Sequence, residues 1–237
     1  MKKWIIIITV PFVFLVGCGP SKFGRQYYQA PEFSFDQVQE KTIGIAILGP
    51  GEVKGYEKGF SKVYKDKATF VAELNEALVA AFKAKGRHSM AANLDNGQKE
   101  AITNEINAHW MEWNNVSESF TKAVSTLCQK EGVDYLFVVK NWYIEGEWTH
   151  THYPASVGPN GTMTGGNNSY KSCFVKLEGA ILSKDGRILF YGGSTAREKV
   201  PFFAFQKTLK KAVAIALDRF SLLLSGDMDE KNIWHPN

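Results

Sequence analysis

Apolar and polar positions between residues 42 and 226 follow two periods, which predict a β-sheet and several helices. Residues 43–48 and 136–139 are almost wholly apolar, as in strands that are covered on both faces, and 133–144 is expected to be a central strand. Residues 172–182 alternate between apolar and polar positions. Asp185-Gly186 is a hairpin signal, so residues 188–195 are expected to return beside them.

Four other segments carry apolar residues at helical spacing along one side only, and each has capping residues at an end. A helix is predicted after Asp66 or Thr69, ending at Gly86, and another after the capping pair Asp95 and Gln98. The other two are predicted after Asn115 with Glu118, ending at Gly132, and over about 204–224, ending at Gly226. Residues 87–94 are expected to form a short strand.

Because each helix is apolar on one side, each must pack on a sheet. The sequence predicts an α/β fold with a single mixed β-sheet packed by amphipathic helices, as a three-layer or two-layer sandwich with an Asp-Gly β-hairpin. Three stretches are expected to be irregular, namely 19–41, 51–66 and the Gly-, Asn- and Thr-rich 146–169. The expected organisation is a signal peptide (1–17), an anchor and tether (18–41), the α/β domain (42–226) and a C-terminal tail (227–237).

The N-terminus has the pattern of a secretory signal. Lys2 and Lys3 precede an apolar run, residues 4–16, that is shorter than the roughly 20 residues a membrane-spanning helix needs. The tetrad Leu15-Val16-Gly17-Cys18 resembles the bacterial lipobox. That resemblance implies cleavage before Cys18, a lipidated thiol and amine, and a lipid bilayer as partner. Gly19 after the cysteine implies the outer membrane, with the protein on its periplasmic face; an ordinary secretory signal is the alternative.

Charge and cysteine content narrow the function classes. Without Lys2 and Lys3 the formal charge falls from +4 to +2, and no Lys/Arg run provides a footprint for nucleic acid. If Cys18 is lipidated, Cys128 and Cys173 remain as a pair in an oxidising compartment. Both are expected to face the same core, which makes them a candidate disulfide, and two buried free thiols are the alternative.

Catalytic and metal-binding patterns are weak. His150 and His152 are two residues apart, so on a strand they share a face and are weak candidates for a metal site with Glu145 or Glu147; an exposed polar strand end is favoured. Gly49-Pro50-Gly51 matches neither phosphate-loop pattern, and no G-x-S-x-G motif occurs. We therefore expect no catalytic residue, no cofactor and no metal.

Aromatic residues flank the stretch 146–169 and are the candidate partner-binding residues. Trp148, Tyr153 and Tyr170 beside an adaptable Gly/Asn-rich segment match the composition of interfaces. The alternative is ordinary strand packing with a solvated loop tip. The stretch is also the longest one expected to be irregular between two strong elements, which favours a functional role.

Taken together, the lipobox, the tether, the strand 43–48, the central strand 133–144, the hairpin 185–190 and the closing helix resemble a group of envelope proteins. The group comprises the curli-secretion lipoproteins, the lipoprotein activators of penicillin-binding proteins and the amino-terminal domain of the Tol translocation protein. It implies a non-catalytic binding or assembly module for envelope proteins. Whether the protein forms homo-oligomers is left open. The alternatives are a subunit of an oligomeric outer-membrane secretion channel and a metal-binding or enzymatic domain. A channel would need two amphipathic hairpins, and only residues 144–175 offer one.

Overall fold

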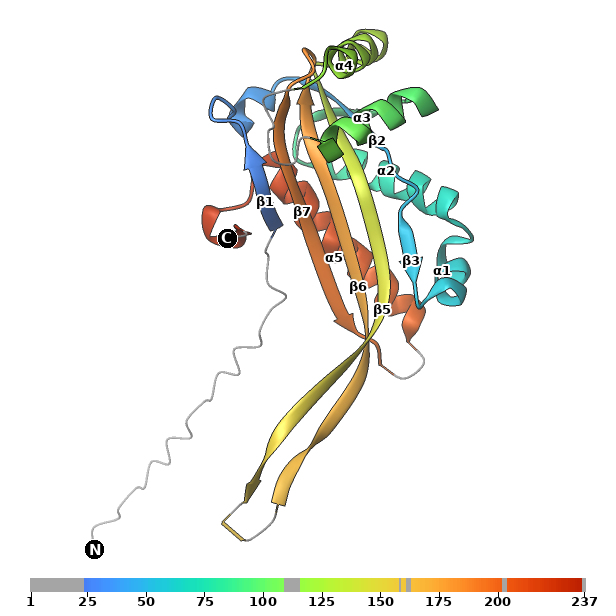
Figure 1. Cartoon of the computed structure of the whole chain (residues 1–237), viewed down its shortest axis with the longest axis vertical. Coiled ribbons are helices and arrows are strands. Elements are labelled where there is room, and N and C mark those ends of the chain that lie inside the picture. The colour runs from blue at the N-terminus through green and yellow to red at the C-terminus, as the bar shows by residue number, and fades with distance from the viewer. Residues whose placement is uncertain (1–23, 109–115, 158, 161–162, 202–203, 236–237) are drawn as a thin grey trace, which may run out of the picture.

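A computed structural model describes residues 24–108, 116–157, 159–160, 163–201 and 204–235. In these residues one eight-stranded sheet lies between two layers of helices (Figure 1). The strands are β1 (Gly24–Gln29), β2 (Thr42–Ile47), β3 (Glu52–Lys54), β4 (His88–Ala91), β5 (Tyr135–Val157), β6 (Met163–Ser183), β7 (Ile188–Lys199) and β8 (Ile233–Trp234). The helices are α1 (Glu57–Tyr64), α2 (Lys67–Ala84), α3 (Asn96–Ala108), α4 (Glu118–Glu131) and α5 (Phe205–Ser225), with 3-10 turns at Phe35–Val38 and Glu230–Asn232.

The sheet is mixed, in the order β4-β2-β5-β6-β7-β1-β8, with β3 beside β5. Strands β4, β2, β3 and β5 run parallel, whereas β5, β6, β7 and β1 form antiparallel pairs and β8 lies parallel to β1. The predicted fold class is confirmed, and the sandwich has three layers. The Asp185-Gly186 turn joins β6 to β7 as expected, with Gly186 at a φ of +79°.

Two separate cores explain why the central strand is apolar on both faces. Helices α1, α2 and α5 cover one face of the sheet and pack against residues such as Phe137 and Val139. Helices α3 and α4 cover the other face, where Leu136 and Val138 are buried. Since neighbouring residues of a strand point to opposite faces, a strand between two helical layers needs apolar residues at every position.

Most of the predicted helix ends are confirmed, with the start of α4 as the exception. The Asp66 carboxylate accepts the Thr69 N–H at 2.7 Å at the start of α2. Asp95 and Gln98 form the reciprocal capping pair of α3, with N–H to side-chain oxygen distances of 3.0 and 2.8 Å. Helix α4 begins with Ser117 as its N-cap, so the predicted cap at Asn115 is wrong; Asn115 itself lies outside the described residues.

All three stretches that were expected to be irregular contain regular structure, so these predictions are wrong. Strands β5 and β6 pair through most of 146–169, from Gly146↔Cys173 to Val157↔Met163. The segment 51–66 contains β3 and α1, and the tether segment contains β1, which pairs with β7. The C-terminal tail adds β8 to the same edge of the sheet. None of the described helices has the length and hydropathy to cross a bilayer.

Candidate functional site

Strands β5 and β6 continue as a pair after their other neighbours have ended. Strand β3 pairs with β5 only as far as Glu145, and β7 pairs with β6 only as far as Ser172. Residues 147–157 and 163–171 then form a two-stranded ribbon that projects from the body, which we call the arm (Figure 1). At about 3.3 Å per residue, its longer strand extends for roughly 35 Å.

Apart from Glu147 and Lys171 at its base, the arm lacks charge, and it has two open edges. From Trp148 to Tyr170 the sequence contains no Asp, Glu, Lys or Arg. No other described strand pairs with the outer side of either strand there. Exposed edges usually carry charges, prolines or bulges that prevent pairing with another chain. The arm has only Pro154 and an irregularity between Tyr153 and Ser156.

A packed aromatic cluster holds the base of the arm to the helices. The Tyr56 and Phe205 rings stack with centroids 4.0 Å apart, which joins the start of α1 to the start of α5. The Lys171 ammonium lies 4.1 Å from the Tyr56 ring centroid. Gly146 of β5 lies against the same ring, so closely that a Cβ atom would overlap it. The base of the arm thus packs against Tyr56, which is itself held by the stacked Phe205 ring.

Charged side chains surround this base. Arg197 pairs with Glu147 at 2.7 Å, and Lys54 lies 3.9 Å from Glu145. The Lys199 ammonium is 4.9 Å from the Tyr170 ring centroid. The change from a charged base to an uncharged arm therefore occurs within one or two residues of Gly146 on β5 and Lys171 on β6.

Tyr56 has a packing role at this base. Burial raises the pKa of its phenol to about 12, with a smaller contribution from the nearby Cys173. Its hydroxyl is buried, with no hydrogen-bond partner within the described residues. A phenol that stays protonated and is shielded from solvent is not suited to acid–base chemistry at neutral pH.

The three predicted partner-binding aromatics all lie on the arm. Trp148 is 63% exposed, which is unusual for a tryptophan, and Tyr170 is half-buried beside Lys199. Tyr153 pairs through its backbone with Gly166, and its side chain lies outside the described set. The lipidation candidate Cys18 also lies outside the described residues. The role of these residues in binding stays a prediction.

His150 and His152 pair with Ser169 and Asn167 on the arm. The structure does not describe the His152 side chain. Among the described residues, no group of three His, Cys, Asp or Glu side chains is placed to hold a metal ion. The observed geometry therefore adds nothing in favour of the weak metal candidates.

The expectation that Cys128 and Cys173 face one core is wrong. Cys128 is buried in the core under α3 and α4, whereas Cys173 is buried in the core under α1, α2 and α5. Both are free thiols on opposite sides of the sheet. Burial raises the pKa of Cys128 to about 11 and that of Cys173 to about 12, so both are protonated at neutral pH.

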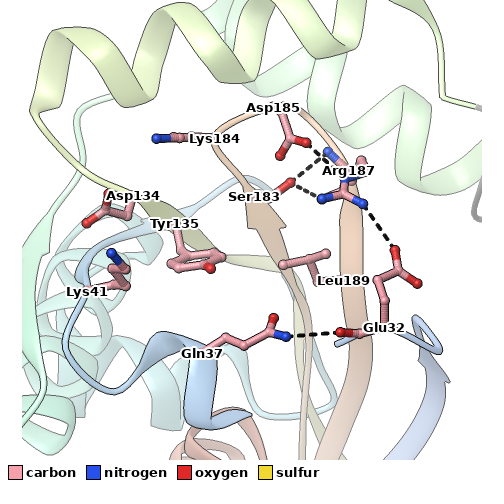
Figure 2. A pocket seen from close by; sticks show the side chains of 10 residues that line it. All are labelled: Glu32, Gln37, Lys41, Asp134, Tyr135, Ser183, Lys184, Asp185, Arg187 and Leu189. Carbon is pink, nitrogen blue, oxygen red and sulfur yellow. Dashed lines mark hydrogen bonds and ion pairs between the residues drawn. The ribbon is translucent and has the colours of Figure 1, made fainter. Parts of the chain in front are cut away.

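A cavity of about 390 Å³, with several charged residues in its lining, lies at the other end of the body, beside the β6–β7 turn (Figure 2). Tyr135 and Leu189 lie among charged side chains of both signs. Arg187 bonds to Asp185 at 2.9 Å and to Glu32 at 3.2 Å, so much of the charge is internally neutralised. Its described lining contains no histidine and no cysteine, and thus no nucleophile with an adjacent histidine base. Sequence reasoning missed this cavity because no motif marks its residues.

Comparisons with known proteins give little further information. No family model matches the chain, and no curated protein matches it. Among solved structures, it is similar to a single-substitution variant of PelC from Paraburkholderia phytofirmans, solved as a dodecamer. The similarity covers 83% of this chain and 95% of that chain, at 10% sequence identity and a TM-score of 0.36. A similarity this low supports no conclusion about function.

Proposed function

We propose that the protein is a lipid-anchored, non-catalytic assembly module of the bacterial envelope, which associates with further copies of itself through the arm. The observation that carries this proposal is the pair of open, uncharged strand edges on the arm. An extended strand that adds to such an edge gains main-chain hydrogen bonds along its length. The lipobox-like Leu15-Val16-Gly17-Cys18 supports anchoring, and Gly19 favours the outer membrane with the domain in the periplasm.

A second copy of the chain is the occupant that fits the arm best. The β5 edge of one arm and the β6 edge of the next are similar in length and carry no charges that would repel each other. Pairing two different edges leaves one edge of each arm open, so the contact repeats from copy to copy. Such head-to-tail contacts close into a ring when the rotation between copies allows it.

The body is suited to presenting the arm at a constant angle. The stacking of Tyr56 on Phe205 and the contact of Gly146 with Tyr56 join the arm base to two helices. Neither core includes a residue between Ile144 and Cys173 among the described positions. The arm can therefore be changed without changing the cores.

The test is to shorten the arm. Thr151 to Asn168 would be replaced by Asn-Gly, because His150 and Ser169 are a cross-strand pair that a two-residue turn can connect. We expect the shortened lipoprotein to keep its urea midpoint and to lose the oligomers that the full-length protein forms in detergent. Light scattering and native mass spectrometry measure both states. An unchanged set of oligomers would reject the role of the arm.

A matched pair of point variants controls for the size of that deletion. Thr151→Lys places a charge in the uncharged part of the arm and should weaken self-association, because charged side chains on a strand edge oppose pairing with another chain. Thr151→Val retains a β-branched side chain without charge and should associate like the wild type. Equal association of the two variants would argue against strand pairing through the arm.

A subunit of an outer-membrane secretion channel is the second candidate function. The arm strands span 11 and 9 residues, which matches the 9–11 residues of a membrane-crossing β-strand, and they carry no charge from 148 to 170. The described residues contain one such arm, whereas a channel of this kind would need two amphipathic hairpins. Single-channel conductance of the purified oligomer in planar bilayers tests this candidate, with the shortened-arm variant as the control.

A further inference from the structure

Four lysines lie on the two helices that begin at the base of the arm. They are Lys58 and Lys62 on α1 and Lys207 and Lys210 on α5, and we call them the lysine collar. All four are exposed, and none forms an ion pair with a described carboxylate. Spacings of four and three residues place each pair on one side of its helix.

The stacked Tyr56 and Phe205 rings bring these two helices together at the arm-bearing end of the body (Figure 1). Helix α1 carries two lysines and one glutamate, and residues 205–215 of α5 carry three lysines and no acid, which gives a net charge of +4. The glutamate, Glu57, already accepts the Gly55 N–H, and Glu73 of α2 shares a groove with Lys210. By contrast, α3 and α4 together carry a net charge of −1.

Strand β1 begins on the side that faces the arm. Gly24 pairs with Ser194, and β7 reaches the arm base five residues later at Lys199, a distance of about 17 Å along the strand. Six residues from Cys18 to Gly24 can span roughly 20 Å. A lipid on Cys18 can therefore reach the level of the arm base, a step that rests on the proposed anchoring.

We infer that the arm-bearing end of the protein binds the surface of an anionic lipid bilayer, with the lysine collar at the phosphate headgroups and the uncharged arm directed toward the lipid. Lysines near a bilayer are attracted to anionic headgroups, and their aliphatic stems lie along apolar surface while the ammonium stays in water. A soluble polyanion would gain from positive charge along the arm, which has none between Trp148 and Tyr170. Binding of the collar to the headgroups does not itself require the arms of neighbouring copies to pair, whereas entry of the arm into the hydrocarbon would, because open strand edges leave backbone groups there without partners.

Lysine footprinting of the full-length lipoprotein tests the inference. The protein is reconstituted in phosphatidylcholine vesicles with or without roughly 30 mol% phosphatidylglycerol, an anionic lipid. Acylation of the lysine amines is then followed by mass spectrometry. We expect the four collar lysines to react at least about threefold more slowly in the anionic vesicles. Lys122 and Lys184, exposed at the far end of the body, should react equally in both.

A charge-neutral variant separates the collar from the lipid anchor. Lys54 and Lys199 are two other exposed lysines near the arm base. Replacing all four collar lysines with Gln should abolish their protection from acylation in the anionic vesicles. Replacing Lys122 and Lys184 with Gln should leave that protection unchanged. Circular dichroism of each variant confirms that it is folded.

Three results would overturn the inference. These are equal labelling of the collar in both vesicles, protection that the collar Gln variant retains, and protection by soluble dextran sulfate without protection by phosphatidylglycerol. The Thr151→Lys variant should be protected like the wild type, since the collar does not depend on arm pairing. Lost protection with intact oligomers would reject this inference alone, and intact protection without oligomers would reject only self-association.

Discussion

Replacing Gly146 with alanine directly tests the contact that fixes the arm to the body. A Cβ atom at this position would overlap two ring carbons of Tyr56 and lie 3.0 Å from the Gly55 carbonyl oxygen. The ring cannot easily move away, because Phe205 stacks on it at 4.0 Å and the Lys171 ammonium lies 4.1 Å from its centroid. Relief of the overlap therefore requires movement of β5 or of the stacked ring pair.

Overpacking of this kind typically costs about 1–3 kcal/mol of unfolding free energy. For a domain of this size, that loss lowers the melting temperature by roughly 2–12 °C. Urea unfolding followed by circular dichroism measures the free energy, and thermal melting gives an independent value. We expect Gly146→Ala to be destabilised within this range.

Gly97→Ala is the matched control. Gly97 lies in the first turn of α3, where the closest atom to an added Cβ is a carboxylate oxygen of Asp95 at 3.4 Å. Alanine has the higher helix propensity, so this variant should be as stable as the wild type or more stable. If Gly146→Ala also unfolds with wild-type free energy, the argument that the Tyr56 ring is fixed is refuted.

A double-mutant cycle assigns the cost to Tyr56. In a Tyr56→Ala background the ring is gone, so Gly146→Ala should cost less than about 0.5 kcal/mol. If the cost is unchanged in this background, the strain arises from the contact with the Gly55 backbone instead. Both results are read from the same urea titrations.

Two further predictions concern the body. Burial raises the pKa of the Cys128 and Cys173 thiols, so at pH 8 both should react with a thiol reagent at least about a hundredfold more slowly in the native protein than in urea. Fast reaction in the native protein, or a disulfide-linked peptide pair in non-reducing mass mapping, would contradict this. Ser117→Ala removes the cap on the Phe120 N–H at 3.2 Å and the hydroxyl bond to Glu105 at 2.6 Å, so it should lower the unfolding free energy by about 1–2 kcal/mol, whereas the exposed Thr126→Ala should not.

Much of the body could be predicted from the sequence because its signals are local. The capping residues Asp66 and Asp95 mark helix starts through hydrogen bonds that span three residues, and Gly132 and Gly226 mark helix ends through their positive φ. Two-sided apolar runs identify strands between helical layers. Neither kind of signal requires knowledge of the rest of the chain.

The arm was missed because its residues do not show the apolar pattern of a buried strand. Gly165-Gly166-Asn167-Asn168 has the composition of a turn, and Pro154 interrupts the opposite strand. These residues are strands because each pairs with a partner across the hairpin, as in Tyr153↔Gly166. Pairing between strands depends on register, which hydrophobic periodicity encodes only weakly in Gly-rich, polar strands.

The cysteine prediction failed for a different reason. Periodicity shows that Cys128 lies on the apolar side of its helix and Cys173 on the apolar side of its strand. It does not show which face of the sheet each helix covers, and a chain can cross to either face between elements. The two thiols belong to different cores for that reason.

The absence of charge over residues 148–170 of the arm is not explained by packing of the body. The named residues of both cores lie outside 145–172, so packing of the body places no demand on the arm sequence. A ribbon exposed to water on both edges would normally carry lysines or glutamates, because they oppose pairing with other chains. Their absence over 148–170, next to a base rich in charged side chains, therefore requires another cause. Contact with another copy of the arm, with lipid, or with both in turn, provides that cause, and the arm and collar variants distinguish the two contacts.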